Sequence, residues 1–290
     1  MRSVRIWPTP CDRLPLTDMH AETCSLPIGV FDSGIGGLTV LKALTEALPQ
    51  ESFVYLGDTA RLPYGTKSAR SVTRYALQTT ALLKDRGVKL LVIACNTATA
   101  MSLDALHEAY PDLPVVGVIR PGAAAACRAS KSGRIGVIAT ESTVNGRSYE
   151  REIVRLRPDA QIFAQPCPLF VPLAEEGWCN GEIAELIATR YLGSMVENTG
   201  IDTLVLGCTH FPVLSEAIQS VVGPDVTLVD SAWTTAEFVR DMLARRDICS
   251  TTASRTLSFL ATDGAERFAR IGGVFLDRPL QAQDVEIVDL

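Results

Sequence analysis

The sequence has little of what marks several large classes of proteins. Only five of its 290 residues are lysines and the net charge is −6, so it lacks the basic excess with which nucleic-acid-binding proteins neutralise phosphates. No apolar run reaches transmembrane length. Residues 1–27 carry arginines and four prolines where a signal peptide would have an apolar segment. We therefore expect a soluble cytoplasmic protein that binds neither nucleic acid nor a membrane.

Cysteine and histidine occur, but not in the patterns of a disulfide framework or a metal site. The eight cysteines contain no C-x-x-C pair, and disulfide frameworks belong to much shorter secreted chains. The three histidines are widely separated, so no spacing supports a Cys/His zinc site. We therefore expect reduced thiols and no metal.

Two apolar stretches end in the same way. Residues 90–97 read LLVIACNT, and residues 203–210 read TLVLGCTH. A short run of Leu, Ile and Val bounded by turn-forming residues is typical of a buried strand in a parallel sheet. Open parallel sheets bind their ligands at the carboxyl ends of the strands. The sequence therefore predicts that Cys95 and Cys208 each stand at a ligand-binding edge.

These strands belong to a longer internal repeat with an offset of about 110 residues. The matching positions are Ile28 with Ile135, Cys95 with Cys208, and Val115 with Val226. Strands alternate with helical patterns in both halves, which is typical of an α/β fold. We predict two pseudo-symmetric α/β domains with mainly parallel sheets and an active site in the cleft between them.

The predicted division of the chain follows from this repeat. Residues 1–27 are expected to form a flexible extension, because their prolines break any helix. Residues 28–119 and 232–290 are expected to form one discontinuous domain, since the last strand returns to the first unit. Residues 120–231 are expected to form the second domain.

A glycine-rich loop, DSGIGG at residues 32–37, follows the first predicted strand. It begins like a dinucleotide-binding fingerprint, but Thr39 occupies the place of the third glycine. The glycines are better explained by a tight turn that brings the backbone close to a small ligand. Asp32, at the end of the strand, could also serve only as a helix N-cap.

Three chemistries fit a pair of cysteines at strand ends. A free thiol is only slightly ionised at neutral pH, and each cysteine precedes a predicted helix whose dipole favours the thiolate. One cysteine could be a nucleophile with His210 as its base, or the two could form a redox pair. Alternatively, the thiols could flank one carbon, one removing a proton and the other delivering one. Only the third explains why the cysteine is duplicated with its strand.

Five blocks of the sequence resemble the signature blocks of the glutamate racemase family. They are VFDSGIGGLTV at 30–40, PYG at 63–65, ACNTA at 94–98, VPLAE at 171–175 and LGCTHFP at 206–212. They occur in the family's order, from about residue 28 onward. The resemblance implies two similar α/β domains and a cofactor-independent interconversion of L- and D-glutamate, which supplies D-glutamate for peptidoglycan. It also implies a homodimer.

The resemblance implies a role for each matching residue. Cys208 would deprotonate L-glutamate and Cys95 D-glutamate, with Asp32 assisting Cys95 and with His210 and Glu175 assisting Cys208. The residues that would hold the substrate are Asp32, Ser33, Tyr64, Gly65, Asn96, Thr97, Thr140, Thr209 and His210, with Thr143 as a further candidate. A pyridoxal enzyme would need a Schiff-base lysine, and no lysine follows residue 131, so no cofactor is expected.

Two other functions stay open on the sequence alone. A related cofactor-independent racemase could act on aspartate or another small acid. A catalytically silent homologue could bind an amino acid or a partner, although a binding protein has no need for both Cys95 and Cys208.

Overall fold

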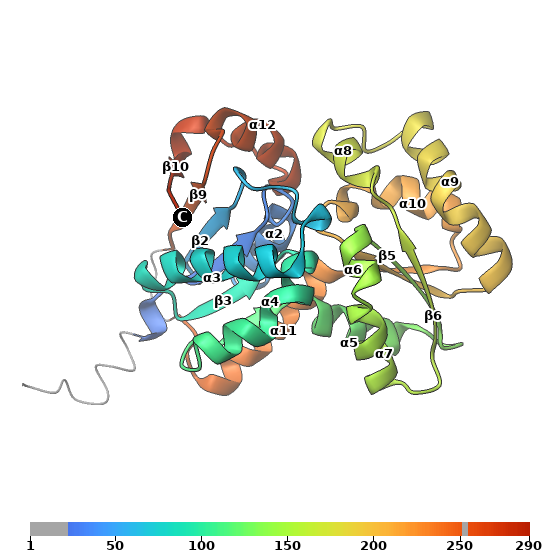
Figure 1. Ribbon diagram of the computed structural model, residues 1–290, viewed down its shortest axis with the longest axis horizontal. Helices are drawn as coiled ribbons and strands as arrows, with labels where there is room; N and C mark the ends of the chain where they lie inside the picture. The colour runs from blue at the N-terminus through green and yellow to red at the C-terminus, as the bar shows by residue number, and fades with distance from the viewer. Residues whose placement is uncertain (1–22, 251–254) are drawn as a thin grey trace, which may run out of the picture.

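Two parallel β-sheets lie side by side in the computed structural model, which describes residues 23–250 and 255–290 (Figure 1). The first sheet has the strand order β10-β9-β2-β1-β3-β4, and the second has the order β6-β5-β7-β8. The first contains β1 (Ile28–Asp32), β2 (Phe53–Gly57), β3 (Leu90–Ile93), β4 (Val115–Gly117), β9 (Leu257–Ala261) and β10 (Val285–Ile287). The second contains β5 (Arg134–Ala139), β6 (Gln161–Pro166), β7 (Thr203–Gly207) and β8 (Thr227–Asp230).

Helices connect these strands, as parallel pairing requires. Those that follow strands of the first sheet or precede its last strands are α2 (Leu38–Ala47), α3 (Ala69–Asp85), α4 (Asn96–Ala109), α11 (Ser231–Arg246) and α12 (Ala265–Leu276). Those of the second half are α5 (Ile119–Ala129), α6 (Glu141–Asn145), α7 (Ser148–Leu156), α8 (Phe170–Glu175), α9 (Glu182–Thr199) and α10 (Ser215–Val222). Short 3₁₀ turns are η1 (Tyr64–Thr66), η2 (Phe211–Leu214) and η3 (Ala282–Asp284).

The strand order confirms the predicted fold class and its internal symmetry. The order β2-β1-β3-β4 of the first sheet recurs as β6-β5-β7-β8 in the second, and every pairing is parallel. Cys95 follows β3 and Cys208 follows β7, so the two thiols stand at equivalent places. In both sheets this place adjoins the strand at which the order reverses, where open α/β sheets bind ligands.

The sequence of residues 144–157 predicts a single helix, and the structure differs from this prediction in one respect. The structure has two helices there, α6 and α7, and Arg147 between them adopts a left-handed conformation with φ of 51°. Asn145 and Gly146 supply the helix-ending residue types at this point. The break turns α7 so that Tyr149 is buried.

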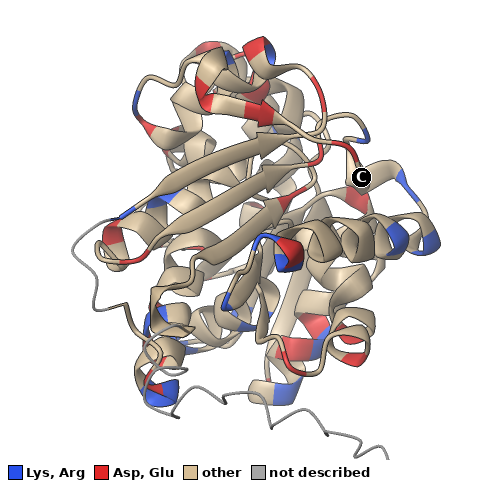
Figure 2. Ribbon diagram, turned by 90° about the vertical axis from the view of Figure 1, so that its left-hand side faces the viewer, with Lys and Arg blue, Asp and Glu red and all other residues tan. Residues whose placement is uncertain are grey.

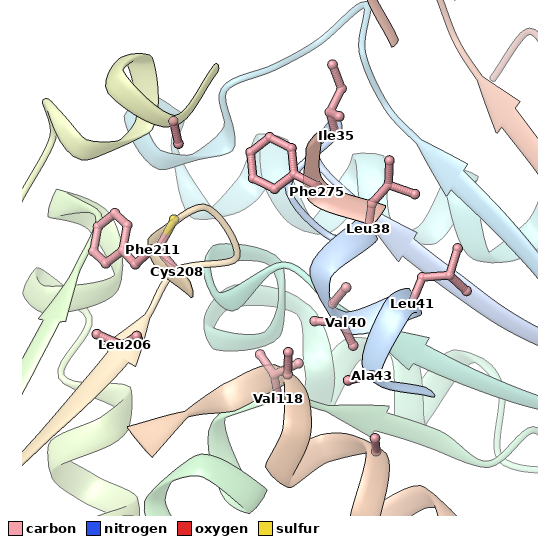
Figure 3. Packing of buried hydrophobic residues seen from close by; sticks show 14 of the residues in the cluster. Ile35, Leu38, Val40, Leu41, Ala43, Val118, Leu206, Cys208, Phe211 and Phe275 are labelled. Atoms are coloured by element: carbon pink, nitrogen blue, oxygen red, sulfur yellow. The ribbon is translucent and has the colours of Figure 1, made fainter. Parts of the chain in front are cut away.

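One apolar cluster runs through both halves. It includes Leu38 and Val40 of α2, Val118 between β4 and α5, and Leu206 with Phe211 around Cys208 (Figure 3). The side of Cys208 that faces this cluster is therefore shielded from water. Lys, Arg, Asp and Glu lie mainly on the helices and loops, and the strands carry few of them (Figure 2). Among the described helices, none is long and apolar enough to cross a membrane.

A buried ion pair ties three separate segments to the first sheet. Lys89 Nζ lies 2.7 Å from Glu51 Oε2 and donates hydrogen bonds to the carbonyls of Cys24 and Ile248, each at 2.8 Å. Residues 1–22 of the predicted extension lie outside the described residues. Residues 23–25 form a helical turn, and Cys24 is buried.

We predict that Lys89→Met lowers the free energy of unfolding by about 3–5 kcal/mol, because it leaves the charge of Glu51 buried and unpaired. The matched control is Lys42→Met, since the Lys42–Asp277 pair is exposed and such pairs contribute about 1 kcal/mol or less. Urea unfolding of both variants measures the difference. Equal losses for the two variants would contradict this account.

Candidate active site

Cys95 occupies the N-terminus of α4, where it is the N-cap residue. Its sulfur accepts a hydrogen bond from the backbone N–H of Ala98 at 3.4 Å, and its thiol donates to Ser33 Oγ at 3.6 Å. Burial raises the pKa of Cys95 to about 12, and the nearby charges of Asp32 and Cys208 add to this, whereas the two hydrogen bonds oppose it. The Cys95 thiol is therefore protonated at neutral pH and suited to donate a proton.

Asp32 ends β1 and is completely buried. Its Oδ2 accepts from the backbone N–H of Gly34 at 2.9 Å, while Oδ1 has no hydrogen-bond partner among the described residues. Burial raises the pKa of Asp32, although the charge of His210 and the loop N–H groups oppose the shift. The helix that follows is capped by Gly37 without a side-chain bond, so Asp32 does not serve as its N-cap.

Cys208 is supported by a different set of groups. His210 Nδ1 lies 3.9 Å from the Cys208 sulfur, and His210 Nε2 lies 3.3 Å from Glu175 Oε1. The other carboxylate oxygen of Glu175 accepts from Arg267 Nη2 at 2.7 Å. The chain after Cys208 forms the turn η2 and no α-helix until Ser215. The expected helix dipole is therefore replaced at Cys208 by an imidazole.

The groups around His210 shift its pKa and that of Glu175. Burial by itself would lower the pKa of His210, but hydrogen bonds with Cys208 and Glu175 and the charges of Cys208 and Asp32 raise it to about 10. Burial opposes ionisation of Glu175, yet His210 and Arg267 outweigh it and hold the pKa of that carboxyl below its usual value. His210 is thus an imidazolium held between a carboxylate and a thiol.

The loops that carry these groups touch across the two halves. A methyl group on Gly36 would lie 2.4 Å from His210 Nδ1 and 2.5 Å from Thr209 Oγ1, so only glycine permits this approach. Thr39 Oγ1 donates to the carbonyl of Thr209 at 3.0 Å. The glycine-rich loop of the first half is therefore fitted against the Cys208 loop of the second.

Three threonine hydroxyls form a second contact between the halves. Thr97, which follows Cys95, has its Oγ1 3.0 Å from Thr140 Oγ1 and 3.2 Å from Thr143 Oγ1. Thr140 and Thr143 are themselves 3.1 Å apart. These hydroxyls can rotate to donate to an anionic ligand.

The Pro63-Tyr64-Gly65 loop is fixed by a buried carboxylate. Asp58 accepts a short hydrogen bond from the Tyr64 hydroxyl and a second from Arg61 Nε. The proton of the Tyr64 hydroxyl is therefore donated to Asp58. A methyl group on Gly65 would lie 3.1 Å from Thr140 Cβ, which places this loop against the second half.

The structure gathers the sequence-predicted residues from both halves into one region, through the contacts described. Asp32, Ser33 and Cys95 lie together, as do Glu175, Cys208, Thr209 and His210, and Thr97 meets Thr140. Sequence reasoning missed Asp58, Tyr149 and Arg267, which support these residues. None of the three belongs to a sequence block, because their importance comes from contacts between distant segments. Thr39 does lie in the first block, but its contact with Thr209 was not predicted.

The geometry favours acid/base chemistry over the other two sequence hypotheses. A redox pair needs a thiolate to attack a disulfide, and burial keeps Cys95 protonated. A single nucleophile with His210 as base would give Cys95 and its carboxylate neighbour Asp32 no function. Two thiols with separate partners suit proton transfer at two positions.

Comparison with known proteins gives consistent matches. The profile of the Asp/Glu/Hydantoin racemase family matches residues 28–239. A glutamate racemase from Geobacter metallireducens is 49% identical over 250 residues, which cover 86% of this chain and 92% of that protein. One from Chlorobaculum tepidum is 42% identical over 272 residues, covering 93% and 99%.

A solved structure agrees with the sequence relatives. The crystal structure of glutamate racemase from Francisella tularensis in complex with D-glutamate has a TM-score of 0.85 and 38% sequence identity, covering 92% of this chain and 98% of that one. These matches confirm the resemblance seen in the five sequence blocks. A chain with two pseudo-symmetric parallel sheets, a cysteine at the same strand end of each, and relatives this similar over nearly its whole length belongs to the Asp/Glu/Hydantoin racemase family.

Proposed function

We propose that this protein is a glutamate racemase, which interconverts L- and D-glutamate without a cofactor. The observation that carries the proposal is the pair of cysteines at equivalent strand ends, each with its own acid/base partners. The sequence relatives and the solved structure are named glutamate racemases. The product would supply D-glutamate for peptidoglycan.

In the proposed reaction the two thiols act on opposite faces of the substrate's Cα. With L-glutamate, the Cys208 thiolate removes the α-proton, and the protonated Cys95 thiol delivers a proton to the other face. With D-glutamate, Cys95 removes the proton and Cys208 delivers one. Each turnover thus leaves the two sulfurs with exchanged protonation states. The high pKa of Cys95 fits its role as the donor in the first direction.

The neighbours of each thiol would carry the charge changes. The imidazolium of His210 lies beside Cys208, where it favours the thiolate that L-glutamate requires. Glu175 keeps His210 protonated through its 3.3 Å contact. On the other side, the charge of Asp32 disfavours the thiolate of Cys95. Its Oδ1 has no hydrogen-bond partner among the described residues and would accept from the substrate ammonium or take up the proton in transit.

The remaining residues would hold the substrate. Removing an α-proton leaves a carbanion-like state, which fixed hydrogen-bond donors stabilise. The residues proposed to supply those donors, from side chains or backbone N–H groups, are Ser33, Tyr64, Gly65, Asn96, Thr97, Thr140, Thr143, Thr209 and His210. Tyr64 and Gly65 would act through their backbone, because Asp58 already engages the Tyr64 hydroxyl.

Three further properties are part of the proposal. We propose that the protein works in the cytoplasm. We also propose that it is a homodimer, and light scattering of the purified protein would test this oligomeric state. We also propose that residues 28–119 with 232–290, and residues 120–231, act as two units that close on the substrate. The contacts of Gly36 and Thr39 with the Cys208 loop support this closure.

Purified protein should abolish the circular dichroism of an L-glutamate solution without any added cofactor. L-Aspartate, tested side by side, should racemise much more slowly. A constant L-glutamate signal would overturn the proposed activity, and a faster reaction with aspartate would reassign the substrate.

We predict that Cys95→Ser and Cys208→Ser each lower kcat/KM by about 10²–10⁴-fold, because a positioned acid/base group contributes about that much. With substrate deuterated at Cα, the primary isotope effect should rise for L-glutamate in Cys208→Ser and for D-glutamate in Cys95→Ser. Cys127→Ser is the matched control, since that half-buried thiol lies on α5 and its hydrogen bond goes to the carbonyl of Ile153, outside the site. If each variant showed the same isotope effect with L- and D-glutamate, the assignment of the two bases would be contradicted.

Glu175→Gln should move the alkaline loss of activity to lower pH. In the native protein the pKa of His210 is raised to about 10, so the imidazolium is lost only as the pH rises through that value. Without the carboxylate charge this pKa falls, and the imidazolium is lost earlier. The pH dependence of kcat/KM with L-glutamate measures the shift, with exposed Glu176→Gln as the control. If kcat/KM of Glu175→Gln fell at the same alkaline pH as that of the wild type, Glu175 would not be what holds His210 protonated.

A further inference from the structure

Tyr149 is a buried residue of α7 that no sequence block contains. Only 2% of its surface is exposed, and it lies in the second half of the chain. Its hydroxyl donates a hydrogen bond to Asn96 Oδ1 at 2.7 Å. Asn96 directly follows Cys95 and opens α4 in the first half. The contact therefore joins a C-terminal-half tyrosine to the loop of the first thiol.

The bond to Tyr149 fixes the orientation of the Asn96 amide. Because a tyrosine hydroxyl that donates must face the carbonyl oxygen, the amide NH₂ has to face the other way. Asn96 Nδ2 is buried, and no described residue accepts a hydrogen bond from it. A buried donor left unpaired is costly, and this one belongs to the residue that follows Cys95. Burial also raises the pKa of Tyr149, so its hydroxyl stays protonated and keeps donating.

The ring of Tyr149 contacts the loop of the second thiol. A methyl group on Gly207, the residue before Cys208, would lie 3.0 Å from Tyr149 Cε2. A methyl group on Gly122, at the start of α5, would lie 3.2 Å from the tyrosine oxygen. Tyr149 is thus packed between the segment that connects the two sheets and the end of β7. One side chain touches the neighbour of each cysteine.

We propose that Tyr149 is a positioning residue that holds the two thiol loops at a fixed separation and directs the Asn96 amide N–H to a carboxylate oxygen of the substrate. The inference rests on the proposed racemase function and adds one positioning residue to the proposed site. The ring acts as a spacer between the residues next to Cys95 and Cys208. The hydroxyl orients the donor.

The two actions can be separated by Tyr149→Phe, which keeps the ring and removes the hydroxyl. The thiols should stay in place, so kcat should change little, whereas KM for both enantiomers should rise about five- to tenfold. Tyr110→Phe is the matched control. Tyr110 is half-buried at the C-terminal end of α4, far from Cys95 along that helix, and its hydroxyl donates to the carbonyl of Leu77. A merely structural role would lower stability or kcat and leave KM unchanged.

A double-mutant cycle with Asn96→Ala tests whether Tyr149 acts through Asn96. If it does, Tyr149→Phe should not raise KM further in the Asn96→Ala background. Additive increases in KM, or an unchanged KM in the single Tyr149→Phe variant, would overturn the inference while the wild type still racemises glutamate. Failure of the wild type to racemise would instead overturn the proposed function.

Discussion

A thiol that leaves water becomes a weaker acid, and the site depends on how each of two buried sulfurs is supported. Desolvation disfavours the thiolate, and Cys95 and Cys208 are each only 6% exposed. The charged groups next to the two sulfurs have opposite signs. Cys95 lies near the carboxylate of Asp32, which raises its pKa further, whereas Cys208 lies near the imidazolium of His210. Pseudo-symmetric strands thus carry chemically unequal thiols.

That inequality has a structural cause. The strand orders of the two sheets match, but the ends of β1 and β5 differ: Asp32 ends β1, and Ala139 ends β5 at the corresponding place. The end of the first strand therefore supplies a carboxylate that the end of β5 does not. On the other side, Glu175 reaches His210 from α8, and Arg267 of α12 pairs with Glu175 from across the molecule.

Close contact between the halves is the second requirement. Gly36 leaves no space for a side chain beside His210, and Thr39 binds the Thr209 carbonyl. Both residues flank the same glycine-rich turn. The glycines first resembled part of a nucleotide-binding fingerprint, and their observed use is the approach of one loop to another.

The sequence predicted the parts of this protein that repeat or that lie in contiguous blocks. The buried strands, the internal repeat and the two cysteines at strand ends were all predictable, because apolar periodicity and local motifs encode them. The break at Arg147 was not, since it depends on a left-handed residue after a modest Asn-Gly signal. Tyr149, Asp58 and Arg267 were also missed, because their partners are brought close only by the fold. The prediction of a helix dipole at Cys208 was also wrong, because the 3₁₀ turn at Phe211–Leu214 follows this cysteine where an α-helix was expected.

Racemisation in heavy water tests the central claim most directly, that two thiols act on opposite faces of one carbon. At low conversion of L-glutamate, the account predicts that the D-glutamate formed carries solvent deuterium at Cα, while the remaining L-glutamate stays protiated. The product's new hydrogen comes from a thiol that has exchanged with solvent, and the abstracted proton stays on the other sulfur. Product that retains the original protium at Cα would show that a single base returns the proton, and would contradict the account.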